Sequence, residues 1–202
     1  LNNFIKNRLI EFAGTLLVII GIFLLISITS YSPSDPNFIY TPENVDIKNL
    51  GGFYGSVISD FLLQSIGLIS FFVTVSLLNW GFTLITDKKI IDFIPKVFFT
   101  LAYIIFGSAF VNIFFINSFW LIDNGNGGFI GRIIKENFYS LTNLVENQYV
   151  VFSILLLAIT FFILSLTIKI KGIIKILSLP YQLSKKIASL LKRKKENDII
   201  VN

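Results

Sequence analysis

Very few side chains in this sequence are of the kinds that carry out chemistry. The 202 residues contain no His, no Cys and no Met, which excludes thiolate nucleophiles, disulfides, and metal sites built on His or Cys. No G-x-x-x-x-G-K-[ST] motif is present, so the sequence has no P-loop to hold a nucleotide. Carboxylates at Asp35, Glu43 and Asp46 could bind a divalent cation weakly, although a solvated loop accounts for them more simply. We therefore expect no catalytic residue, metal or cofactor in this chain.

One carboxylate, Glu11, lies near the head of an apolar stretch, and Arg8 precedes it by about one helical turn. Ionisable residues inside a membrane are by default candidates for function. At the end of a span, however, an Arg8–Glu11 ion pair whose side chains reach the interface is the simpler interpretation. Asn79 and Asn112 lie within later apolar stretches, where an amide can hydrogen-bond between helices.

The elements that position these residues are those of a membrane protein. Hydrophobic residues make up 54% of the chain and charged residues 14%, and the mean hydropathy is +0.77. A soluble domain carries about 25% charged residues. This chain therefore has too few charges to cover a water-facing surface of its size.

Four apolar stretches are long enough to cross a bilayer core about 30 Å thick, which requires roughly 20 helical residues. They cover about residues 9–29, 61–85, 94–116 and 149–168. Stretches of this length in lipid must satisfy their own backbone hydrogen bonds, so the sequence predicts an all-α membrane domain over residues 1–175. The first stretch exceeds the apolar core of a signal peptide, about 7–15 residues, and is interpreted as a span.

Lys and Arg are distributed unevenly among the connections. Fourteen of the 17 lie in the N-terminal flank, the short second connection and the C-terminal tail, and three lie in the two long connections. Loops rich in Lys and Arg stay on the cytoplasmic side of a membrane. The sequence therefore predicts that both termini are cytoplasmic and that both long connections lie outside the cytoplasm.

The two long outer connections contain the same short motif, which is Gly-Gly-Phe-Tyr-Gly in the first and Gly-Gly-Phe-Ile-Gly in the second. We interpret the four spans as two tandem helix–loop–helix repeats. Each outer loop would then carry a GGFxG turn and a short interfacial helix. The candidate residues of the two turns are Gly51, Gly52, Phe53, Gly55, Gly127, Gly128, Phe129 and Gly131.

Two interpretations of these turns are open. Paired glycines permit positive φ and a close approach of the backbone, so each motif can simply be a structural turn, which is the commoner use of such pairs. Alternatively, the turns form a ledge on which a partner outside the cytoplasm docks, with Phe53 and Phe129 as interfacial anchors.

The C-terminal segment, residues 176–202, has the pattern of a basic amphipathic helix followed by the start of a linker. Its basic run consists of Lys192, Arg193, Lys194 and Lys195. Such a helix beside a membrane suits anionic lipid, at about 1 kcal/mol per basic residue near the surface. The same charges could contact DNA phosphates, and we favour lipid because it is closer.

Two phrases occur at defined places relative to the spans. Ser30–Pro36, which is Ser-Tyr-Ser-Pro-Ser-Asp-Pro, comes directly after the first span, and Asn49–Gly55, which contains the first glycine pair, comes before the second. With Arg8 and Glu11 and the second Gly-Gly-Phe-Ile-Gly, they resemble the N-terminal four-helix membrane domain of the bacterial DNA translocases of the FtsK/SpoIIIE family. The resemblance covers about residues 5–175. The sequence departs from the family in lacking a motor or DNA-reading domain, as expected for a chain that starts without Met and stops in a linker.

The resemblance implies a function that composition and charge do not. It implies a non-catalytic inner-membrane anchor at the division septum. This anchor would bind other cell-division membrane proteins and would itself form a homo-oligomer, a hexamer. The anchor would tether an ATP-driven DNA pump, so that ATP, Mg²⁺ and the DNA contacts belong to a motor outside this chain. The loop residues expected to meet a partner, stiffened by two prolines, are Tyr31, Pro33, Asp35 and Pro36.

Two other classes of function are open on the residues alone. A small transporter or channel subunit built on the two-fold repeat would need polar residues that converge at mid-membrane, and only Asn79 and Asn112 favour it. A membrane enzyme acting through outer-loop carboxylates is the weakest alternative, because the sequence has no His and no tight carboxylate cluster.

Overall fold

The computed structural model describes residues 2–40, 46–88, 90, 93–115, 117–118, 120–121, 124–141 and 147–167. Within these ranges the chain is helical and contains no strand, as the apolar pattern predicted. The predicted basic segment, with Lys192–Lys195, lies outside the described residues. The elements are α1 (Asn2–Thr29), α2 (Gly52–Ile66), η1 (Gly67–Ile69), α3 (Ser70–Asp87), α4 (Phe93–Phe114), α5 (Gly128–Leu141) and α6 (Gln148–Ser165).

Four helical stretches are long and apolar enough to cross a membrane, which confirms this part of the prediction. At 1.5 Å per residue, the 18 residues of α6 extend roughly 27 Å, close to the thickness of a bilayer core. Local signals mark the ends of these helices. The side chain of Asn147 accepts a hydrogen bond from the N–H of Tyr149 at 2.9 Å at the start of α6. Pro95 lies in the first turn of α4, where its missing N–H costs little.

The second span differs from a single helix over residues 61–85. α2 ends at Ile66, one 3₁₀ turn follows, and α3 begins at Ser70. Gly67 has φ +60°, and a Cβ at this position would overlap the carbonyl of Asn126. The same carbonyl accepts a hydrogen bond from the N–H of Leu68 at 2.9 Å. The break is therefore held by a segment almost 60 residues away, which the local sequence pattern does not reveal.

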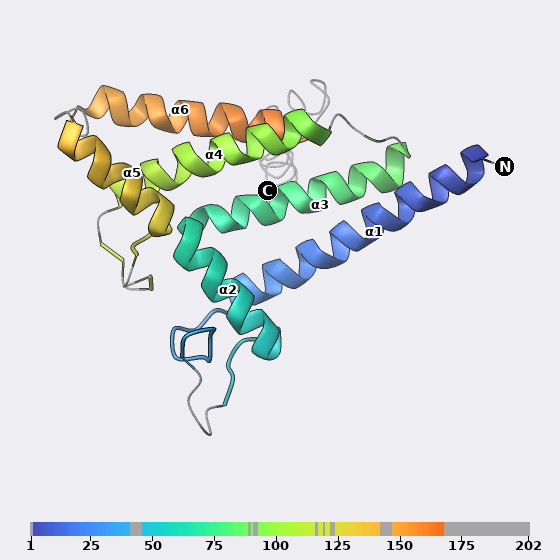
Figure 1. Ribbon diagram of the computed structural model, residues 1–202, viewed down its shortest axis with the longest axis horizontal. Helices are drawn as coiled ribbons and strands as arrows, with labels where there is room; N and C mark the ends of the chain where they lie inside the picture. Colours follow the sequence, from blue (N-terminus) through green and yellow to red (C-terminus); the bar gives the residue numbers. More distant parts are fainter. Residues whose placement is uncertain are drawn as a thin grey trace, which may run out of the picture. The chain divides into compact units, whose positions relative to one another are not determined.

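α1 lies along α3, and α4 lies along α6 (Figure 1). Glycines let α1 and α3 approach closely, because a Cβ on Gly14 or Gly81 would come within 2.8 Å of the carbonyl oxygen of the other residue. Gly21 accommodates Leu78, whose Cδ2 would lie 2.7 Å from a Cβ there. Gly14 and Gly21 thus form the close helix contact that small residues allow in membranes.

Aromatic rings fill the contact between α4 and α6. Phe161 stacks against Phe99 and Phe106, with ring centroids 6.1 and 5.7 Å apart. Tyr103 meets Phe162 edge-on, with ring centroids 5.4 Å apart. Edge-on and stacked pairs add to the energy gained from burial alone.

α2 and α5 lie across one end of the two helix pairs and contact each other (Figure 1). α2 also packs on α1, and α5 packs on α4. The order of elements in the first half, a long helix, a transverse helix and a returning helix, occurs again in the second half. The residues that carry the GGFxG motifs begin both transverse helices.

At the opposite end, side chains from α3 and α4 hold the last turn of α6. The ammonium group of Lys96 donates to the carbonyls of Leu164 and Leu166 at 2.8 and 2.5 Å. The indole N–H of Trp80 donates to the carbonyl of Ser165 at 2.8 Å. Carbonyls at a helix end have no partner within the helix, and these donors supply one from neighbouring helices.

Candidate functional site

The two long connections keep the name outer, after the orientation predicted from charge. The first outer connection is held together by a buried carboxylate. Asp35, which is 2% exposed, accepts hydrogen bonds from the N–H groups of Lys48 and Asn49 at 3.1 and 2.8 Å. Hydrogen bonds to an ionised acceptor are roughly twice as strong as neutral ones. Asp35 therefore clamps its own part of the loop to the two residues that lie 13 and 14 positions further along the chain.

Asn49 joins this clamp to the helices beneath it and is 4% exposed. Its Nδ2 donates to the carbonyl of Ser27 in α1 at 2.8 Å and to Oγ of Ser59 in α2 at 3.2 Å. Its Oδ1 accepts from the N–H of Gly51 at 2.9 Å. One amide thus fixes the loop, the end of α1 and the start of α2 in a single arrangement.

Tyr31 links the two outer connections. Its hydroxyl donates to Oδ1 of Asp60 at 2.9 Å, and its ring meets Trp120 edge-on with centroids 5.5 Å apart. Tyr31 also belongs to a buried apolar cluster with Leu121, Ile28 and Leu63. Since Trp120 and Leu121 come from the second connection, this cluster ties the two halves together at their outer end.

The glycines of both GGFxG motifs permit close contacts with a preceding long helix. A Cβ on Gly51 or Gly55 would come within 2.6 and 2.8 Å of Oγ of Ser27 in α1. In the second motif, a Cβ on Gly127 or Gly131 would overlap the carbonyl of Ser108 in α4. The glycines at the first and fifth positions of each motif therefore let the transverse helix lie directly on the long helix before it.

The second glycine of each motif has positive φ. Gly52 and Gly128 both have φ +64°, a conformation that favours glycine. A Cβ on Gly128 would lie 2.7 Å from the backbone N of Ile66, whereas nothing lies within 4 Å of a Cβ on Gly52. The two positions therefore share a backbone conformation but differ in how tightly they are enclosed.

An outer pocket of about 480 Å³ opens between the two connections. Nδ2 of Asn124 donates to Oε1 of Gln64 across it at 2.9 Å. Exposed phenylalanine rings beside amide and carboxylate groups offer both apolar surface and hydrogen bonds, which is the usual make-up of a binding site. We call it the outer pocket, and it is lined by Asn37, Phe38, Ile39, Asp60, Phe61, Gln64, Ser65, Asn124 and Phe129.

The residues predicted from sequence to meet a partner divide into exposed, half-buried and buried groups. The exposed members are Pro33, Phe53 and Phe129, and of these only Phe129 lines the outer pocket. Gly51 and Gly52 are half-buried. The buried members, which shape the surface from beneath, are Tyr31, Asp35, Pro36, Gly55, Gly127, Gly128 and Gly131.

Sequence reasoning missed the amides that organise this region, namely Asn49, Gln64 and Asn124. A weak signal for two of them was present, because an asparagine precedes each glycine pair by two or three residues. Asparagine is common in turns, where its side chain bonds to nearby backbone. Gln64 lies in an apolar helix and carried no signal of its own.

The pair at the head of α1 is part of a larger cluster. Glu11 accepts from Arg8 through Oε2 at 2.5 Å and from Lys88, at the end of α3, through Oε1 at 2.6 Å. The sequence placed Arg8 beside Glu11, but it did not indicate Lys88, which is 77 residues further along. The cluster joins α1 to α3 at the end opposite the outer pocket.

Comparison with known proteins gives one consistent result. Residues 6–172 match the family model described as the 4TM region of DNA translocase FtsK/SpoIIIE. The chain is 33% identical over 88 residues to the DNA translocase FtsK of Azospirillum brasilense. These aligned residues cover 43% of this chain and 14% of the relative. It is 30% identical over 171 residues to the DNA translocase FtsK of Rickettsia prowazekii. These aligned residues cover 85% of this chain and 21% of the relative. The chain thus spans about a fifth or less of these relatives, and no solved structure matches it.

Proposed function

Because the chain belongs to the 4TM region of the DNA translocases FtsK/SpoIIIE, we propose that it anchors such a translocase at the division septum. Its four apolar helices make it a multi-pass segment of the bacterial inner membrane. In this proposal the anchor is itself non-catalytic. ATP, Mg²⁺ and DNA are handled by a motor in the full-length protein, and the anchors assemble as a hexamer.

The proposed orientation places both termini in the cytoplasm. The concentration of Lys and Arg in the flanks and in the short connection supports this orientation. The outer pocket and the GGFxG turns then face away from the cytoplasm, and the end of α6 faces the motor. A cytoplasmic motor would pull on that end, where Lys96 and Trp80 hold the last turn of α6.

The observation that carries the docking part of the proposal is the outer pocket. Its lining comes from the first connection, from α2 and from the second connection with α5. Phe38, Phe61 and Phe129 are 79%, 59% and 48% exposed there. A cell-division membrane protein that inserted a side chain into this pocket would contact both halves of the anchor at once.

We also infer that the two halves are tandem repeats. The equal φ of Gly52 and Gly128 supports this inference, as does the way that each motif lies against the long helix before it. In both halves the transverse helix begins at the second glycine of the motif. A duplicated unit accounts for the likeness in sequence and in local geometry together.

The anchor is favoured over a transporter by the positions of two amides. Oδ1 of Asn79 accepts from the N–H of Thr167 at 2.7 Å, at the end of the bundle where α6 stops. Nδ2 of Asn112 donates to the carbonyl of Asn124 at 3.2 Å, at the outer end. The two amides therefore bond at opposite ends of the bundle, whereas a transport site would need them together at mid-membrane.

The test is septal recruitment of a fluorescent fusion of the full-length protein. Phe129→Ser removes an exposed ring of the outer pocket and should reduce recruitment while the protein still inserts. Leu50→Ser is the matched control, because Leu50 is 79% exposed on the same side but does not line the pocket. Equal recruitment of both variants and the unaltered protein would refute docking at this pocket.

A second test separates the two interpretations of the glycine turns. Gly51→Val and Gly52→Val should impair recruitment if the turns present a docking surface. Loss of stability with normal recruitment would show that the turns are only structural. Insertion is followed by protease protection of the membrane-embedded protein, and stability by its unfolding in detergent.

A further inference from the structure

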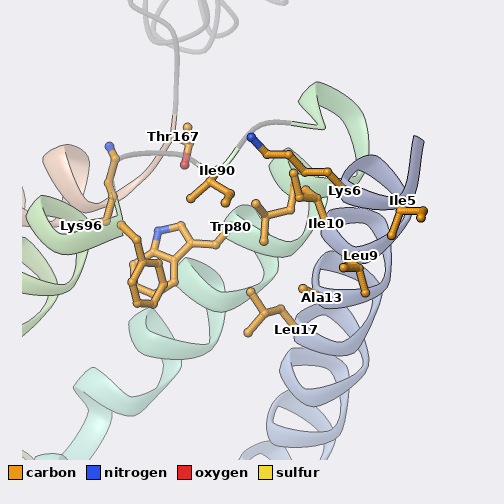
Figure 2. Close-up of a pocket in the computed structure, with 12 residues that line it drawn as sticks. Ile5, Lys6, Leu9, Ile10, Ala13, Leu17, Trp80, Ile90, Lys96 and Thr167 are labelled. Atoms are coloured by element: carbon orange, nitrogen blue, oxygen red, sulfur yellow. The ribbon is translucent and has the colours of Figure 1, made fainter. Parts of the chain in front are cut away.

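An apolar groove of about 480 Å³ opens at the end of the bundle opposite the outer pocket. The N-terminal half of α1 forms one wall, and the end of α3 with the start of α4 forms the other (Figure 2). The residues that line it are Ile5, Lys6, Leu9, Ile10, Ala13, Leu17, Trp80, Leu84, Ile90, Phe93, Lys96 and Thr167.

The groove has a charged end and an apolar end. In Figure 2 the amino groups of Lys6 and Lys96 lie at one end, and Leu17 lies at the other. Along α1, the 11 steps from Lys6 to Leu17 rise roughly 16 Å, which is about half of a 30 Å bilayer core. The groove therefore has the length of one leaflet and carries its positive charges where that leaflet ends.

The polar groups at the charged end are hydrogen-bond donors. Lys6 is exposed and has no ion-pair partner among the described residues. Lys96 carries a second positive charge, although it also donates to carbonyls at the end of α6. The hydroxyl of Thr167 is buried and has no hydrogen-bond partner in the part of the chain that the structure describes. The nearby carboxylate of Glu11 is already bound by Arg8 and Lys88.

We propose that this groove binds one anionic phospholipid. Its phosphate lies between Lys6 and Lys96, with the Thr167 hydroxyl as a further donor, and one acyl chain lies along Leu9, Ala13 and Leu17. The proposal rests on the membrane location of the domain. The proposed orientation adds only that the lipid comes from the cytoplasmic leaflet. Basic pockets between membrane helices on that side are suited to anionic headgroups.

The lipid fits the groove better than a second copy of the chain or its own tail. A second copy of the chain would have to place a carboxylate beside the two lysines, and the tail carries nine Lys and Arg residues that the lysines would repel. A phospholipid brings a negative charge and hydrocarbon in one molecule. The groove opens on α1, whose Phe12, Leu16 and Ile19 are 69%, 48% and 59% exposed and would face lipid. Lipid is thus the neighbour that this surface meets in the membrane.

The first measurement is lipid binding to the purified protein in detergent, monitored by native mass spectrometry. We expect phosphatidylglycerol to bind more tightly than phosphatidylcholine. Lys6→Gln should weaken phosphatidylglycerol binding roughly fivefold, the equivalent of about 1 kcal/mol per basic residue at an anionic surface. Lys48→Gln is the matched control, because it removes the same charge from the outer connection. Equal binding of both lipids, or equal losses in the two variants, would overturn the proposal.

A second pair of variants tests the apolar part without a change of charge. Ala13→Phe places a ring inside the groove and should reduce retention of phosphatidylglycerol, while Ile19→Phe places a ring on α1 outside it and should not. A photo-crosslinking residue at position 13 identifies the occupant in native membranes. Crosslinks to lipid support the proposal, and crosslinks to a second copy or to residues 168–202 overturn it. Lipid binding by purified protein is independent of septal recruitment, so either proposal can fail alone.

Discussion

Replacing Asp35 by Ala should open the first outer connection without unfolding the membrane helices. The carboxylate is 2% exposed and accepts two backbone hydrogen bonds, from Lys48 and Asn49. A hydrogen bond to a charged group contributes about 1.5–3 kcal/mol. Because the bond from the Lys48 N–H is only partly buried, the lower value suits this loop, and the pair of bonds contributes about 3 kcal/mol.

Amide hydrogen exchange measures this loss directly. An opening free energy lower by about 3 kcal/mol raises exchange at Lys48 and Asn49 on the order of 100-fold, while amides within α1 keep their rates. Asp35→Asn retains one acceptor oxygen and should give an intermediate rate. Asp46→Ala is the matched control, since it removes an exposed carboxylate from the same connection. If Asp35→Ala and Asp46→Ala exchange alike at these two amides, the clamp is not what holds the loop.

Three further outcomes are expected. Gly67→Ala should lower the free energy of unfolding in detergent by about 3 kcal/mol, because it adds backbone overlap to an unfavourable φ. Gly52→Ala, at nearly the same φ but with open space around the new Cβ, should lower it by about 1 kcal/mol. Similar losses in the two variants would contradict the contact at the break. Glu11→Gln releases Lys88 and should destabilise the protein at low salt but hardly at about 1 M salt, where the Debye length is about 3 Å. A loss of stability that does not depend on salt would contradict a stabilising ion pair between α1 and the end of α3. Trp80→Phe removes the indole donor to the end of α6 and should lower the free energy of unfolding by about 1 kcal/mol; unchanged stability would show that this bond is not needed.

The spans were predictable because their signal is local and redundant. Some 20 consecutive apolar residues exclude other structures in lipid, whatever the neighbouring helices do. The break at Gly67 was not predictable, because it depends on contact with Asn126 and Gly128 in the other half. A glycine in an apolar helix has several uses, and only the distant partner distinguishes them.

The sequence pointed to the connections that line the candidate site but not to the roles of their residues. The motifs with Tyr31 and Asp35 marked the first connection, part of which lines the outer pocket, and their residue types suggested contact with a partner. In the structure these side chains are buried and support the loop. The sequence could not separate the two roles, because a tyrosine or an aspartate in a proline-containing loop suits a buried clamp as well as an exposed contact. The Tyr31–Asp60 bond joins residues 29 positions apart, beyond any local pattern.

The contact of Gly67 with Gly128 is made by backbone on both sides, and this has an evolutionary consequence. When two side chains touch, a larger residue on one side can be compensated by a smaller one on the other, and the two positions co-vary among relatives. Neither glycine has a side chain to reduce, so no second change at the partner position can compensate for a substitution. Coupling methods that depend on paired changes will therefore find no signal at this contact. It would instead leave two invariant positions that seem unrelated in an alignment.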